Sequence, residues 1–255
     1  MIQPTLLFGA ALAILSAVIY FYVGRVLSRR RVASPDARLA WTLFVTWWYA
    51  LATSTLVGAV ISLLGAFNLA GVALFVTFNH VNLLAVCVAL FGLMYYLIYL
   101  FTGSRRLLWP LAIFYIVYYM LLIYFVQARV PIGVTVGRWS AGIEFQRDPI
   151  QPLYLIVLLL LIFPQVIGSL AYFALYFRVR TVTQKYRILL VSWSIIIWFL
   201  SSFLANISGL AGQDWWQIAS RLIGLAASLT ILLAYDPVPW LRRRLGINSI
   251  AEEPA

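Results

Sequence analysis

The chain has 255 residues, of which 64% are hydrophobic and 10% are charged, and its mean hydropathy is +0.98. A soluble domain of this length would carry far more surface charge, so the composition excludes a soluble globular protein. The net charge of +11 does not indicate nucleic-acid binding, because the cations stand in short clusters between long apolar segments, as membrane topology requires.

Seven apolar segments follow one another along the chain. Each is long enough to cross a hydrocarbon core about 30 Å thick as a helix rising about 1.5 Å per residue. They predict an all-α membrane protein, a seven-transmembrane-helix bundle that forms one domain over residues 1–240, with residues 241–255 as a short tail. The predicted spans are 4–25, 39–65, 69–101, 107–128, 152–177, 187–210 and 215–235.

The loops between these spans predict the orientation of the bundle. The first, third and fifth loops and the tail hold most of the arginines, whereas the second loop has no charge and the sixth has only Asp214. The positive-inside rule therefore places the N-terminus outside and the C-terminus in the cytoplasm. Lys185 is the only lysine among 18 basic residues, a bias that favours a bacterial source and hence the bacterial inner membrane.

The outer loop between the fourth and fifth spans is the longest. Ile132, Val134 and Val136 alternate with smaller or polar residues, and Ile143 and Phe145 alternate again after a "GRWSAG" segment. This pattern predicts a short β-hairpin over the outer face. Such a hairpin is either a lid on an outward pocket or a cap with no ligand beneath it.

Polar side chains in the third span form one arc. At 100° per residue, His80 and Asn82 lie on either side of Asn79 and complete an arc of roughly 160°. An arc of this kind must face other helices or a wet cavity, because polar groups are costly against lipid. For His80 two interpretations stay open: a hydrogen-bonded interior residue, or a ligand contact or pH sensor.

The seventh span carries a polar stripe. Asp214, Gln217, Arg221, Gly224 and Ser228 recur on one helical face. Arg221 is the only charge placed well inside any span, and a charge at that depth needs partners or water. It either extends toward the outer interface and Asp214, or binds an anionic or carbonyl-bearing ligand at the outer end.

Further polar residues lie in the fifth and sixth spans. Ser194, Ser201 and Ser208 recur every seven residues, which is typical of a small-residue packing contact between helices. Gln165 follows a proline near the middle of the membrane, and Ser202 and Asn206 form a second polar face. We predict one outward-facing pocket whose ligand-binding residues are Asn79, His80, Asn82, Gln165, Ser202, Asn206, Gln217 and Arg221.

The sequence offers little catalytic chemistry. No Asp or Glu lies deep in a span, so the usual carboxylates of proton or cation coupling are missing. A lone histidine with no acid or cysteine cluster cannot build a zinc site. No set of nucleophile, base and orienting acid is visible. We therefore expect no catalytic residues, no metal and no enzymatic activity.

The layout resembles that of rhodopsins and seven-helix receptors, and that of uncharacterised bacterial seven-helix membrane proteins. The segments "KYRILLVSWSIIIWFLSSFLANISG" and "DWWQIASRLIGLAASLTILLAYDP" look like the last two helices of such bundles. Opsins hold retinal on a lysine of the seventh helix. This chain has none there, which excludes a covalent retinal and leaves room only for a non-covalent pigment or lipid.

Together these features favour a membrane sensor or ligand-binding protein that signals through a partner in the membrane or the cytoplasm. Two alternatives stay open. The chain could be a non-catalytic subunit of a larger membrane complex, or a small-solute transporter or channel. The expected partners are the lipid bilayer and either other membrane subunits or a cytoplasmic signalling protein, with no nucleic acid.

Overall fold

The computed structural model describes residues 3–30, 32, 34–127, 131–145, 163, 166–211 and 215–247. In chain order its elements are α1 (Pro4–Ser28), α2 (Pro35–Ala66), α3 (Val72–Thr102), α4 (Leu108–Gln127), β1 (Pro131–Val136), β2 (Ala141–Phe145), η1 (Leu175–Phe177), α6 (Val182–Ala211), α7 (Trp215–Tyr235) and α8 (Pro239–Leu245).

Five of the described helices are long and apolar enough to cross a membrane: α1, α2, α3, α7 and the part Val182–Ala205 of α6. This confirms a helical integral membrane protein. Leu108–Tyr124 and Val166–Phe177 are shorter apolar helices. Most of the predicted fifth span, 152–177, lies outside the described residues. The short helix α8 was not predicted, and it begins just before the predicted tail.

Local sequence explains where α2 begins and α3 ends. The Ser34 hydroxyl accepts a hydrogen bond from the backbone N–H of Ala37 at 3.1 Å, and Pro35 occupies the first turn of α2. Gly103 ends α3 with a φ of 63°, a conformation that glycine adopts without strain. The Arg105 guanidinium then pairs with Asp36 at 2.8 Å and joins the loop after α3 to the first turn of α2.

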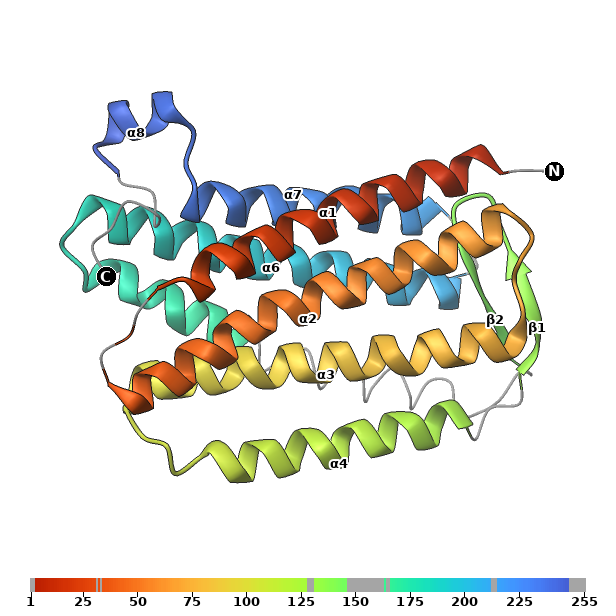
Figure 1. Cartoon of the computed structure of the whole chain (residues 1–255), viewed down its shortest axis with the longest axis horizontal. Helices are drawn as coiled ribbons and strands as arrows, with labels where there is room; N and C mark the ends of the chain where they lie inside the picture. The colour runs from red at the N-terminus through yellow and green to blue at the C-terminus, as the bar shows by residue number, and fades with distance from the viewer. Residues whose placement is uncertain are drawn as a thin grey trace.

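The long helices pack side by side (Figure 1): α4 lies against α3, α3 against α2, α2 against α1, α1 against α7, and α7 against α6. The segment Val166–Phe177 lies beside α6, since the Ser169 hydroxyl donates to the Ser192 carbonyl at 3.0 Å. It also lies beside α3, because a Cβ on Gly168 would be 2.7 Å from Leu97 Cδ1. This segment therefore packs between α3 and α6.

The largest core cluster lies toward the end of the bundle at which α1 ends and α2 begins. Its centre is a group of fully buried aromatic side chains, and Tyr20 of α1 stacks on Trp48 of α2 with ring centroids 5.9 Å apart. Val191 and Ile195 of α6 and Ile231 of α7 belong to the same cluster. Large side chains thus hold five helices together at this end.

The predicted hairpin is confirmed. β1 and β2 pair antiparallel with Val134 opposite Ile143 and Val136 opposite Ala141. The hairpin lies across the bundle end opposite to α8 (Figure 1). It contacts α2 closely there, because a Cβ on Gly65 would be 2.6 Å from the Ala141 Cβ.

Candidate functional site

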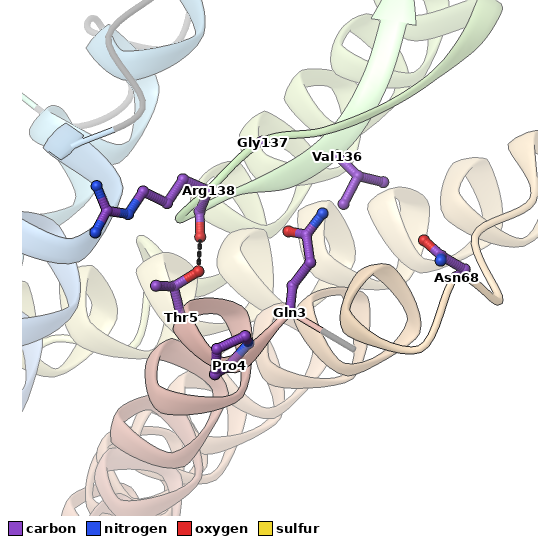
Figure 2. Close-up of a pocket in the computed structure, with 7 residues that line it drawn as sticks. All are labelled: Gln3, Pro4, Thr5, Asn68, Val136, Gly137 and Arg138. Atoms are coloured by element: carbon purple, nitrogen blue, oxygen red, sulfur yellow. Dashed lines mark hydrogen bonds between the residues drawn. The ribbon is translucent and has the colours of Figure 1, made fainter. Parts of the chain in front are cut away.

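An open cavity of about 650 Å³ lies where the hairpin meets the start of α1 and the end of α2. We call it the hairpin cavity. Its lining combines polar side chains with apolar and backbone surface from three separate segments. The lining residues are Gln3, Pro4, Thr5, Asn68, Val136, Gly137 and Arg138 (Figure 2).

Gln3 is the most informative residue of this cavity. Its backbone N–H donates to the carbonyl of Ala66 at 3.2 Å, which holds the start of α1 against the end of α2. Its side chain extends toward the hairpin, where Val136 lies (Figure 2). The side-chain oxygen Oε1 is buried and has no hydrogen-bond partner among the described residues. A buried acceptor of this kind is rare and costly unless a ligand or water donates to it.

Two further contacts fix the shape of the cavity. The Thr5 hydroxyl donates to the backbone carbonyl of Arg138, which ties α1 to the hairpin turn (Figure 2). Asn68 follows α2 in the turn toward α3, with a φ of 57° in the left-handed region that asparagine tolerates better than most residues. The cavity is therefore held by one backbone hydrogen bond, from Gln3 to Ala66, and by one side-chain hydrogen bond, from Thr5 to Arg138.

Arg221 lies about one turn of α1 away from this cavity, toward the middle of the bundle. Its Nη2 donates to the Ser62 hydroxyl at 2.5 Å, so it reaches from α7 to α2. A Cβ on Gly9 would be 1.9 Å from Nη1, which means that the guanidinium lies directly on the backbone of α1. Gly9 follows Thr5 by one helical turn on the same face, about 6 Å along the axis. Asp214, the other partner considered for Arg221, lies outside the described residues.

The polar arc of α3 divides between two neighbours. Asn82 faces α2, where its Oδ1 accepts from the Ser54 hydroxyl at 2.6 Å. Asn79 and His80 are both half-buried, and His80 Nε2 is buried with no hydrogen-bond partner among the described residues. Asn82 and Arg221 each bind α2, at serines about 12 Å apart along its axis. That the whole arc faces the protein interior stays a prediction.

His80 and Ser202 each follow the side of their helix that faces a second core cluster. Leu83 and Cys87 of α3 form a second core cluster, against which Trp198 of α6 packs. His80 lies three residues before Leu83, on the side of α3 that faces the cluster. Ser202 lies four residues after Trp198, on the side of α6 that faces the cluster. His80 and Ser202 both lie nearer than the cluster to the hairpin end of the bundle. A contact between His80 and Ser202 stays a prediction.

The remaining predicted residues contact α6 or are not described. Gln217 Nε2 donates to the Ala205 carbonyl of α6 at 3.0 Å. Gln165 and the side chain of Asn206 lie outside the described part of the structure. Ser194 and Ser201 do form the predicted helix contact, and the side chain of Ser208 is not described. A single pocket over all eight predicted residues stays a prediction, and those of the eight whose side chains the structure describes do not line the hairpin cavity.

Sequence reasoning missed the cavity residues Gln3, Thr5, Asn68 and Arg138. The available signal was weak: one polar residue just before the first span, one at its second position, one asparagine in an uncharged loop and one arginine in the hairpin. Their meeting depends on the hairpin folding back over α1 and α2. Among the described residues, no three His, Cys, Asp or Glu side chains come close enough to hold a metal ion.

Comparison of the chain with protein-family models, with curated proteins and with solved structures found no match. The site must therefore be interpreted from its own geometry.

Proposed function

We propose that this chain is a seven-helix membrane sensor of the bacterial inner membrane, which binds a small polar ligand in the hairpin cavity and signals through a partner. One observation carries the proposal: Gln3 lines a cavity of about 650 Å³, and its buried Oε1 has no hydrogen-bond partner among the described residues. A ligand with a hydrogen-bond donor would satisfy that oxygen, and a carbonyl or anionic group on the ligand would suit the Arg138 guanidinium.

The distribution of charge supports an outward-facing cavity. The end of the bundle opposite the hairpin carries most of the cations, and basic loops stay in the cytoplasm. The N-terminus and the hairpin are accordingly proposed to lie outside and α8 inside. The cations at the α8 end are Arg25, Arg29, Arg30, Arg38, Arg105, Arg106, Arg178, Arg180, Lys185, Arg187, Arg242, Arg243 and Arg244.

α1 offers a route from the cavity to the other end. It begins at the cavity and runs without a break to Ser28. On the way the Tyr20 hydroxyl donates to the Gly224 carbonyl of α7 at 3.2 Å, and the Tyr22 hydroxyl donates to Asp236 at 3.1 Å. A ligand that draws the hairpin and the start of α1 together would shift α1 against α7 near their cytoplasmic ends, where a partner could detect the shift.

The test is a search for bound small molecules in the gently purified full-length chain by mass spectrometry. The wild-type protein is expected to carry a small polar compound that is lost in Gln3→Leu. Gln184→Leu is the matched control, because Gln184 is an exposed glutamine at the opposite end. Equal ligand content in wild type and Gln3→Leu would contradict the proposal. Copurification of a stoichiometric second chain would instead favour the alternative that this chain is a subunit of a larger complex. Solute flux in liposomes would favour the alternative that it is a transporter.

A further inference from the structure

The short helix α8 follows α7 after the sequence Asp236–Pro237 and ends at Gly246, whose φ of 61° stops the helix. Figure 1 shows α8 beyond the row of long helices, at the end of the bundle where α1 ends. Three consecutive arginines, 242 to 244, lie in its last turn. What distinguishes α8 is that these arginines do not share one role.

Arg242 fixes the orientation of α8. Its Nη2 pairs with Asp236 Oδ1 at 2.5 Å, and its Nε donates to the carbonyl of Pro237 at 2.6 Å. The other carboxylate oxygen of Asp236 accepts the Tyr22 hydroxyl of α1. Arg242 therefore turns back toward the bundle and sets which face of α8 points away from it.

The outward face carries Trp240 between two arginines. At 100° per residue, Trp240 lies about 160° from Arg242, while Arg243 and Arg244 lie about 60° and 40° on either side of Trp240. The Trp240 side chain is 62% exposed, and Arg243 and Arg244 are exposed as well. An indole with a guanidinium on each side is thus presented to the surroundings within nine residues of the end of α7.

The chemistry of this face matches a lipid headgroup. An indole prefers the level of the headgroups, and guanidinium groups bind phosphate through paired hydrogen bonds. α7 is apolar enough to cross the membrane, so the bilayer surface lies close to α8. We propose that Trp240, Arg243 and Arg244 form a binding site for the phosphate headgroup of anionic phospholipids, with Arg242 as its positioning residue. This site is independent of the hairpin cavity.

The test is a titration of the full-length chain in mild detergent with phosphatidylglycerol, followed by native mass spectrometry. Each arginine is expected to contribute about fivefold to the apparent affinity, so Arg243→Gln/Arg244→Gln should weaken binding by about 25-fold. Trp240→Ala should also weaken binding. The matched control is Arg178→Gln/Arg180→Gln, which removes the same charge from exposed positions of another loop at the same end and should leave the affinity within about twofold.

Three outcomes would overturn the site. The Arg243→Gln/Arg244→Gln variant could bind phosphatidylglycerol as tightly as wild type. The control variant could lose as much affinity, which would mean that net charge alone attracts the lipid. Inorganic phosphate could compete with the lipid at equal concentration, which would indicate a free-phosphate site and leave no role for Trp240. Tighter binding of phosphatidylglycerol than of phosphatidylcholine to wild type is required in every case.

Discussion

The α2–α3 contact and the α6–α7 contact join neighbouring helices in different ways. Between α2 and α3 the backbones approach so closely that a Cβ on Gly92 would be 2.4 Å from the carbonyl oxygen of Leu43. Between α6 and α7, serines donate across to backbone carbonyls: Ser201 to Ser220 at 2.7 Å and Ser194 to Ala227 at 2.9 Å. The α2–α3 contact relies on close packing of the two helix backbones, and the α6–α7 contact relies on hydrogen bonds.

The difference reflects the solvent. Lipid tails are as apolar as leucine, so helices in a membrane gain little from hiding apolar side chains from lipid. They associate through close packing or through hydrogen bonds between helices. In this chain, helices pack closely around the aromatic core, and they form hydrogen bonds with one another where α6 and α7 carry small residues. Substitutions should therefore cost more at the α2–α3 contact, because a steric clash with a backbone cannot relax.

Gly92→Ala is expected to give the largest loss. The new methyl group would meet the backbone of α2, so one helix must move, at a cost of about 3 kcal/mol of unfolding free energy. The measurement is titration of the purified protein from mild detergent into sodium dodecyl sulfate. Gly58→Ala is the control, since nothing lies within 4 Å of a Cβ there. A Gly92→Ala protein as stable as the control would show that the close approach is unimportant.

Ser62→Ala tests the place where α1, α2 and α7 meet. It removes the acceptor of the Arg221 guanidinium, and a hydrogen bond to a charged group is worth about 2 kcal/mol. Arg221→Met in the same protein should restore part of that loss, because the charge is then gone. The free energies of unfolding of the wild type, the two single variants and the double variant form a double-mutant cycle. Strict additivity would contradict a direct Arg221–Ser62 interaction.

Much of the fold could be predicted, because hydropathy and helix length are properties of the sequence. The described helices begin and end within a few residues of the predicted spans, apart from α6, which begins at Val182 rather than 187. The alternation of Ile132, Val134 and Val136 located the hairpin correctly. Helix α8 was missed because seven residues after a proline give no periodic pattern long enough to recognise.

The site could be predicted only in part, because helical periodicity says which face is polar and not which neighbour it meets. Asn82 and Arg221 were placed in one pocket, yet each binds a different serine of α2. The position of Gly9 under the guanidinium could not be foreseen, since it depends on how α1 crosses α7. Gln3 gave only a weak signal, because its place in the cavity depends on a hairpin more than a hundred residues away.

Ser54→Ala tests the hydrogen bond that the α2–α3 contact does contain. Loss of the hydroxyl leaves Asn82 Oδ1 without that donor, and we expect a loss of about 1 kcal/mol in unfolding free energy. Thr53→Ala is the neighbouring control. Thr53 is exposed and its hydroxyl donates within α2 to Tyr49, so its removal should change little. Equal effects of the two substitutions would show that the hydrogen bond between Ser54 and Asn82 adds nothing to the free energy of unfolding.

Ser201→Ala should have the smallest effect, about 0.6 kcal/mol, although it removes a bond between α6 and α7. The Ser220 carbonyl has two lone pairs and keeps its own helical hydrogen bond, so this acceptor stays satisfied. The buried Ser220 hydroxyl loses only a long contact of 3.3 Å with the Ser201 hydroxyl. Ser228→Ala is matched in burial and in chemistry, but its hydroxyl donates within α7 to Leu225. The difference between the two variants in the same detergent titration isolates the bond between helices. If Ser201→Ala costs as much as Gly92→Ala, hydrogen bonds would dominate over fit throughout the bundle.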